Sequence, residues 1–194
     1  GLSTADLRPR DKPSTSKPRR DLEEKLANLI RQHLLGDPGN TLAICLWGPP
    51  GSGKTTLARE CAWQAGFETF LMSGDYQTKY TSESASRLKA VFAFLRTRKA
   101  VVIFDEIDNL VGQRGTDGES STRDHNLTVG SLYTELDKTP LVLLGTTNLQ
   151  SGLDQGYMSR VGRNLYSMPA ADLAERHAFL EEAKLLPRGL IKAE

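Results

Sequence analysis

The chain has 194 residues, of which 38% are hydrophobic, and this is enough for one domain with a sizeable core. No apolar run approaches the roughly 20 residues that a membrane-spanning helix needs, which argues against a membrane protein. The N-terminus is too polar and proline-rich for a signal peptide, and Cys45 and Cys61 have the character of small core residues rather than of a disulfide framework. We therefore expect a cytoplasmic protein.

The formal net charge of +1 hides a basic N-terminus. Residues 1–20 contain six basic and two acidic residues, a local charge of +4, together with Pro9, Pro13 and Pro18. Because it has no apolar period, this segment predicts a flexible basic arm. The arm is either a solvated linker, which is the simpler interpretation, or a contact for nucleic acid or an acidic partner.

Residues 21–170 are predicted to form a domain of alternating strands and helices. Asp21 and Glu24 form the expected capping pair of a first helix, which ends at Gly36. Apolar runs and 3.6-residue periods then predict strands at 41–47, 67–72, 100–104, 141–145 and 164–168, and helices at 54–65, 82–95, 127–137, 153–159 and 172–186. Such alternation is typical of an α/β fold, here a five-stranded parallel sheet with helices on both faces. The polar stretch 112–126 is expected to be a long loop.

Residues 48–55, Gly-Pro-Pro-Gly-Ser-Gly-Lys-Thr, match the phosphate-binding pattern G-x-x-x-x-G-K-[ST] between a predicted strand and a predicted helix. In that context the loop N–H groups and the positive end of the helix form a cradle for phosphate oxygens. Lys54 would reach the β- and γ-phosphates of ATP, and the Thr55 hydroxyl would bind Mg²⁺. A glycine-rich surface turn is the alternative. The predicted nucleotide-binding residues are Pro50, Gly51, Ser52, Gly53, Lys54, Thr55 and Thr56.

Acidic residues follow the apolar run 100–104 directly, in the order Asp105-Glu106-Ile107-Asp108. This resembles a Walker B motif, in which Asp105 would hold Mg²⁺ and Glu106 would polarise the attacking water as general base. The alternative is an acidic helix N-terminus that is favoured by the helix dipole.

With these two motifs the chain resembles the AAA ATPases of the AAA+ superfamily, a type of P-loop NTPase, from about Asp21 to about Leu186. Thr146-Thr147-Asn148 resembles sensor 1, whose polar residue helps to orient the lytic water. The resemblance implies that the strand before Asn148 lies between the phosphate-loop and Walker B strands, so that the amide faces the γ-phosphate. Otherwise Asn148 is an ordinary turn asparagine.

Two further segments resemble parts of the family that act outside the subunit's own phosphate site. Arg160-Val-Gly-Arg163 resembles the arginine-finger segment, which implies that both arginines act on the nucleotide of a neighbouring subunit. Lys79-Tyr80 resembles the first pore loop, where an aromatic ring grips a polypeptide substrate. The alternatives are solvated surface arginines and a surface or core tyrosine.

The resemblance implies a Mg²⁺-dependent ATPase that works as a hexameric ring and remodels, unfolds or disassembles proteins, without a membrane partner. The catalytic residues would be Lys54, Glu106, Asn148, Arg160 and Arg163. Residues 171–194 are expected to begin a helical lid, most of which is missing. One alternative is a nucleic-acid-acting AAA+ ATPase, such as a loader or helicase-like motor, that uses the basic arm. The other is a nucleotide-gated assembly module with little turnover.

Overall fold

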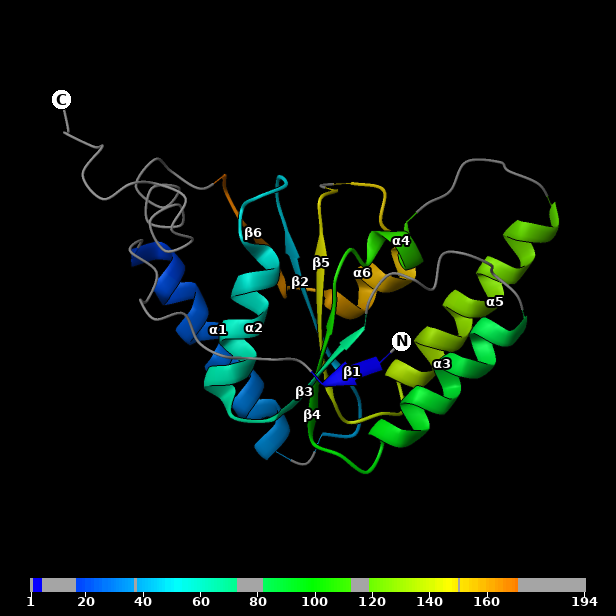
Figure 1. Cartoon of the computed structure of the whole chain (residues 1–194), viewed down its shortest axis with the longest axis horizontal. Coiled ribbons are helices and arrows are strands. Elements are labelled where there is room, and N and C mark those ends of the chain that lie inside the picture. Colours follow the sequence, from blue (N-terminus) through cyan, green and yellow to red (C-terminus); the bar gives the residue numbers. More distant parts are fainter. Residues whose placement is uncertain are drawn as a thin grey trace.

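The described part of the chain is one sheet with helices on both faces (Figure 1). The computed structural model describes residues 2–4, 17–36, 38–72, 82–112, 119–149 and 151–170. Its elements are β1 (Leu2–Thr4), α1 (Lys17–Leu35), β2 (Leu42–Trp47), α2 (Lys54–Ala65), β3 (Glu68–Met72), α3 (Ser82–Leu95), β4 (Ala100–Phe104), α4 (Asp108–Val111), α5 (Glu119–Leu136), β5 (Val142–Thr147), α6 (Gln155–Val161) and β6 (Leu165–Ser167). None of the helices in these ranges is long and apolar enough to cross a membrane.

The strands lie in the order β1-β3-β4-β5-β2-β6, and all except β1 are parallel to their neighbours. This confirms the α/β fold with a five-stranded parallel sheet. The sixth strand, β1, was not predicted; it pairs antiparallel with β3, with Leu2 opposite Met72. Three residues are too few to show a period, and an open sheet edge accepts main-chain pairing from many sequences. Part of the predicted basic arm is therefore an edge strand.

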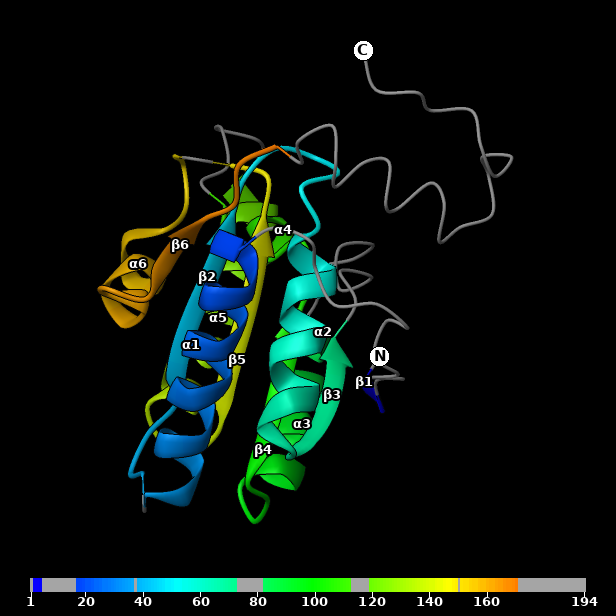
Figure 2. The ribbon, with the colours of Figure 1, turned by 90° about the vertical axis from the view of Figure 1, so that its left-hand side faces the viewer.

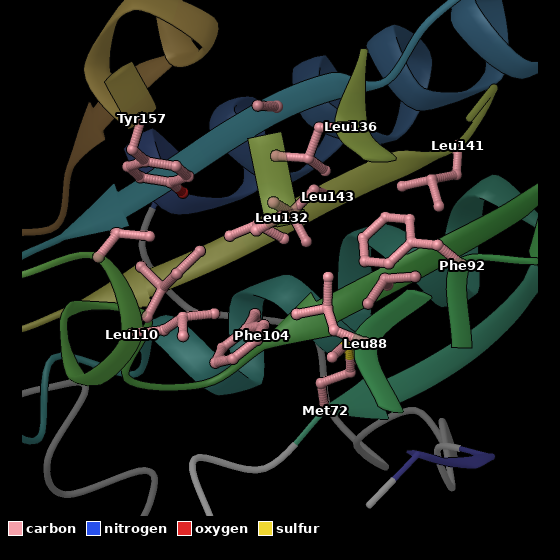
Figure 3. Close-up of a cluster of buried hydrophobic side chains, with 14 of the residues drawn as sticks. Met72, Leu88, Phe92, Phe104, Leu110, Leu132, Leu136, Leu141, Leu143 and Tyr157 are labelled. Atoms are coloured by element: carbon pink, nitrogen blue, oxygen red, sulfur yellow. The ribbon is translucent and has the colours of Figure 1, made fainter. Parts of the chain in front are cut away.

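Alternation along the central strands divides the buried side chains between the two faces of the sheet. In β4, Val101 packs in a cluster with α1 and α2, while Val102 packs on the opposite face. Figure 2 shows α1 and α2 in front of the sheet. Figure 3 shows the cluster on the opposite face, where Phe92 of α3, Leu132 of α5 and Tyr157 of α6 cover the strands. The central strands β4 and β5 are buried on both faces, as expected for a parallel sheet.

The predicted bounds of α2, α3 and β4 are confirmed, whereas the bounds of α1, α5 and α6 differ from prediction. The first helix begins at Lys17, so Asp21 lies inside α1 and the predicted capping pair is wrong. The last part of the predicted loop is helical, because α5 begins at Glu119. Residues 119–126 contain no apolar residue, so no period marks this helix in the sequence. The short α4 was also missed, and the predicted helix at 172–186 lies outside the described residues.

Both cysteines are free and fully buried, as predicted for core residues. Cys45 lies in β2 and Cys61 in α2, and they belong to clusters on opposite faces of the sheet. Burial raises the pKa of Cys45 to about 11 and raises the pKa of Cys61 as well. Both thiols therefore stay protonated at neutral pH and contribute as small apolar groups.

Candidate active site

The polar residues predicted from separate motifs lie at the carboxyl ends of three neighbouring strands. β5 pairs with β4 on one side and with β2 on the other. The phosphate loop follows β2, the acidic residues follow β4, and Asn148 follows β5. The strand order required by the sensor 1 interpretation is therefore confirmed, and the three segments meet at one edge of the sheet.

The phosphate loop leads from β2 into the N-terminus of α2. Gly51 and Gly53 have φ angles of 77° and 79°, in the left-handed region that favours glycine. Gly53 is the N-cap residue of α2 and provides no side-chain capping bond. The N–H groups in the first turn of α2 therefore need a ligand or solvent as hydrogen-bond acceptor. The first turn contains the predicted residues Lys54, Thr55 and Thr56. This arrangement is an anion cradle.

Lys54 joins the phosphate loop to the end of β5. Its Nζ donates to Gly48 O at 2.9 Å, to Pro49 O at 2.9 Å and to Asn148 Oδ1 at 2.8 Å. Burial lowers the pKa of Lys54, and the charges of Asp105 and its acidic neighbours oppose that shift. The ammonium is thus directed at the site by the same asparagine that was predicted to face the γ-phosphate.

Thr55 and Asp105 place two oxygen atoms side by side where Mg²⁺ was predicted. Thr55 Oγ1 donates to Asp105 Oδ1 at 2.7 Å, and Thr146 Oγ1 donates to the same oxygen at 2.5 Å. No group of three or more metal-ligating His, Cys, Asp or Glu residues occurs in the ranges that the structure describes. A hydroxyl and a carboxylate fit Mg²⁺, which retains water and phosphate oxygens as its remaining ligands.

Glu106 has an unusual backbone conformation that presents its carboxylate at the surface. Its φ of 53° makes it the one non-glycine residue with positive φ among the described residues. Its N–H donates to Thr146 Oγ1 at 3.1 Å, and its Oε2 accepts from Asn109 Nδ2 at 3.1 Å. A left-handed backbone costs a non-glycine residue on the order of 1–3 kcal/mol, and such outliers cluster at functional sites. The conformation supports the interpretation of Glu106 as general base.

The two predicted arginine fingers differ in their surroundings. Arg160 forms a two-pronged ion pair with Asp137, with Nε to Oδ1 at 2.9 Å, and its guanidinium lies 4.4 Å from the ring centre of Tyr133. It also donates to Gly156 O at 3.0 Å. Arg163 is exposed and forms no hydrogen bond or ion pair within the described ranges. Arg160 thus has a role within its own chain, and Arg163 is free to contact a second molecule.

The site also contains residues that the sequence did not single out for these roles. Thr146 and Asn109 hold the acidic residues in place, and Arg19 of α1 donates to the phosphate loop. The segment Thr146–Asn148 had been noted, but only Asn148 had been given a role. The predicted pore-loop residues Lys79 and Tyr80 lie outside the described residues.

Taken together, a phosphate loop, a lysine, a hydroxyl and carboxylate pair and a candidate base define a P-loop nucleoside triphosphatase. The family model described as "ATPase family associated with various cellular activities (AAA)" matches residues 44–168, and the chain belongs to this family of ATPases. The resemblance inferred from the motifs is therefore confirmed.

Individual relatives and a solved structure agree with this assignment. The chain is 34% identical over 168 residues to the "ATP-dependent zinc metalloprotease FtsH" of Rhodococcus erythropolis, covering 82% of the chain and 19% of that protein. It is 36% identical over 126 residues to the "Mitochondrial inner membrane i-AAA protease supercomplex subunit YME1" of Saccharomyces cerevisiae, and the match covers 62% of the chain and 16% of that protein. It is 32% identical over 148 residues to spastin of Naegleria gruberi, covering 72% and 28%.

The fold resembles that of the FIGL-1 AAA domain, solved in complex with ADP. The TM-score is 0.73 at 21% identity, and the match covers 98% of this chain and 65% of that one. The chain spans only 16% to 28% of the length of the three relatives named above. The comparisons therefore establish the ATPase module and its fold.

Proposed function

We propose that this chain is the ATP-hydrolysing module of a ring-forming AAA protein that remodels protein substrates. The observation that carries the hydrolytic part is the convergence of Lys54, Asp105, Glu106 and Asn148 on one sheet edge. The protein substrate is supported by the relatives, since FtsH and YME1 are named as proteases or protease subunits.

Each residue of the site has a distinct role in this proposal. Lys54 exchanges its carbonyl partners for phosphate oxygens, while the α2 N-terminus binds the phosphates through N–H groups. Thr55 and Asp105 would hold Mg²⁺, which neutralises phosphate charge when bound. Glu106 takes the proton of the attacking water, and Asn148 orients that water.

Assembly into a ring is supported by the exposed position of Arg163. A guanidinium without a partner in its own described surroundings is suited to a phosphoryl group on a neighbour. Arg160 would first have to leave Asp137 and Tyr133. Of the six basic residues of the N-terminal segment, Arg19 is held against the phosphate loop and is not available to nucleic acid.

The test is phosphate release as a function of protein concentration, with a permanently unfolded polypeptide or duplex DNA added. We expect turnover per chain to rise with concentration and to rise again with polypeptide but not with DNA. Glu106→Gln serves as the control for contaminating ATPases. If only DNA stimulated ATP turnover, and did so at low salt but not at high salt, the nucleic-acid alternative would be favoured. If neither the polypeptide nor DNA changed the rate of ATP turnover, the proposed remodelling of protein substrates would be contradicted.

We also propose that Tyr80 grips the polypeptide. Tyr80→Ala should retain basal turnover and lose stimulation by polypeptide, while Tyr80→Phe should retain both, because apolar contact needs the ring and not the hydroxyl. Equal stimulation of the wild type and Tyr80→Ala would contradict this role.

A further inference from the structure

Arg19 lies against the back of the phosphate loop, although it belongs to α1, outside the residues that the family model matches. Its two terminal nitrogens donate to Ser52 O at 3.3 Å and to Gly53 O at 3.0 Å. The side chain is only 10% exposed and lies 3.8 Å from a carboxylate oxygen of Glu60 on α2. A Cβ on Gly53 would lie 2.6 Å from the guanidinium, so glycine is what permits this close approach.

The contacts of Arg19 constrain which way two peptides of the loop face. In a planar trans peptide the C=O and the following N–H point in opposite directions. By holding the carbonyl of Ser52, Arg19 directs the N–H group of Gly53 to the other side of the loop. The carbonyl of Gly53 also accepts from Leu57 N–H at 2.9 Å, so there Arg19 reinforces a peptide orientation that α2 already sets. Gly51 and Gly53 make this loop conformationally permissive, so an external anchor restricts peptide rotation that glycine would otherwise allow.

The positive charge of Arg19, like the position of its side chain, favours binding of an anion by the phosphate loop. A guanidinium stays protonated at all physiological pH values and matches two acceptors with its planar fork. A cation bound to a carbonyl polarises the peptide and strengthens its N–H as a donor. Both effects favour an anion on the face of the loop opposite Arg19.

We propose that Arg19 is a positioning residue of the nucleotide site, which presets the phosphate loop from behind and thereby raises affinity for ATP and ADP alike. The inference depends on the ATP-binding function of the site. It assigns a role in nucleotide binding to one basic residue of the N-terminal segment. It also makes the docking of α1 a determinant of nucleotide affinity.

The competing explanation is that Arg19 merely fastens α1 to α2, and the chain offers a matched control for it. Arg31, also on α1, donates to the Gln64 carbonyl of α2 and to Asn28 Oδ1. It therefore joins the same two helices through the same chemistry, but at the end of α2 remote from the phosphate loop. The two arginines differ in the contact with the phosphate loop and in the ion pair of Arg19 with Glu60.

The experiment is titration of the full 194-residue chain with fluorescent Mg-ATP and Mg-ADP analogues, alongside thermal unfolding without nucleotide. Arg19→Gln should weaken both nucleotides about tenfold, the loss expected for hydrogen bonds from a charged donor. In turnover it should raise KM and leave kcat little changed, because the hydrolytic residues are untouched. The nucleotide affinity of Arg31→Gln should stay within about twofold of the wild-type affinity. Its unfolding midpoint should fall by about as much as that of Arg19→Gln, because both substitutions remove contacts between α1 and α2.

Arg19→Lys keeps the charge without the fork, and its affinity should fall between those of the wild type and Arg19→Gln. If Arg19→Gln does not fold, the nucleotide affinity of Arg19→Lys alone tests the proposal. Wild-type affinity in either Arg19 variant, or equal loss in Arg19→Gln and Arg31→Gln, would overturn the proposal. A wild-type chain that binds no nucleotide would overturn the ATP-binding function as well, so the two failures are distinguishable.

Discussion

At the scale of single residues, Lys54 and Glu106 serve different steps, and two substitutions separate them. Lys54→Ala removes the cation directed at the phosphates and should weaken ATP binding by roughly 10- to 100-fold. Glu106→Gln keeps the shape of the side chain and leaves Asp105 in place. It should retain binding but lower kcat by about 10² to 10⁴, the usual contribution of a general base.

Nucleotide titration and phosphate release measure the two effects independently. Unchanged phosphate release by Glu106→Gln would show that another group acts as base. Loss of binding in both variants would show instead that Glu106 supports the phosphate site.

Thr146 is the residue that connects the two acidic residues to β5. Its hydroxyl donates to Asp105 and accepts from the Glu106 N–H, and its carbonyl accepts from Ile107 N–H at 2.8 Å. Thr146→Val keeps the shape but leaves the Glu106 N–H without this acceptor. We expect kcat to fall about tenfold with little change in ATP affinity, and Thr146→Ser to restore most of the activity.

The matched control for Thr146 is Thr139→Val. Thr139 is also fully buried, but its hydroxyl has no hydrogen-bond partner in the described part of the chain. Losing this hydroxyl should leave activity unchanged and stability equal or higher. If both valine variants lose activity equally, the effect of Thr146→Val is general damage to the core and not a positioning effect.

At the scale of elements, Gly145 shows how closely β5 approaches α6. A Cβ at Gly145 would lie 2.3 Å from the Tyr157 hydroxyl oxygen and 3.2 Å from Ile107 carbons, and both side chains are fully buried. Gly145→Ala should therefore lower the free energy of unfolding by about 1–3 kcal/mol through overpacking. Because Ile107 follows the candidate base, ATP turnover should fall as well.

Gly130→Ala is the comparison for this substitution. Gly130 lies within α5, and nothing comes within 4 Å of a Cβ added there. Alanine is favoured over glycine inside a helix by about 0.5–1 kcal/mol, so this variant should be slightly stabilised. Chemical denaturation of both variants measures the difference, and equal stability would contradict the close approach of α6 to β5.

At the scale of the whole molecule, the two arginines test whether one subunit completes the site of another. Arg163→Ala should keep nucleotide affinity and thermal stability, because the side chain is exposed, but should hydrolyse ATP about 10³-fold more slowly if it acts as a finger. Arg160→Ala should lower stability, since it also removes the ion pair with Asp137 and the contact with Tyr133.

Mixing distinguishes action on the neighbour from action within the chain. Arg163→Ala subunits retain their own phosphate loop and can borrow an arginine from Lys54→Ala subunits, so the mixture should recover part of the activity. Co-sedimentation verifies that the two variants assemble together. Mixed assemblies without recovery would exclude a role for Arg163 on the neighbour's nucleotide.

The sequence by itself determined the features that depend on neighbours in the chain. The phosphate loop is one contiguous pattern of eight residues, and α2, α3 and β4 have the bounds predicted from their periods. The acidic residues were found because they directly follow a buried strand. Local sterics and burial periods act over a few residues, so a single sequence is sufficient to recognise them.

Only the tertiary structure decided which distant residues meet at the site. Thr146 lies 40 residues from Glu106, Arg19 lies 34 residues from Gly53, and Asp137 lies 23 residues from Arg160. Their contacts depend on the order of the strands and on how α1 and α6 dock, which no local period encodes. The positive φ of Glu106 is likewise imposed by partners on β5 and α4, since its own side chain disfavours that conformation.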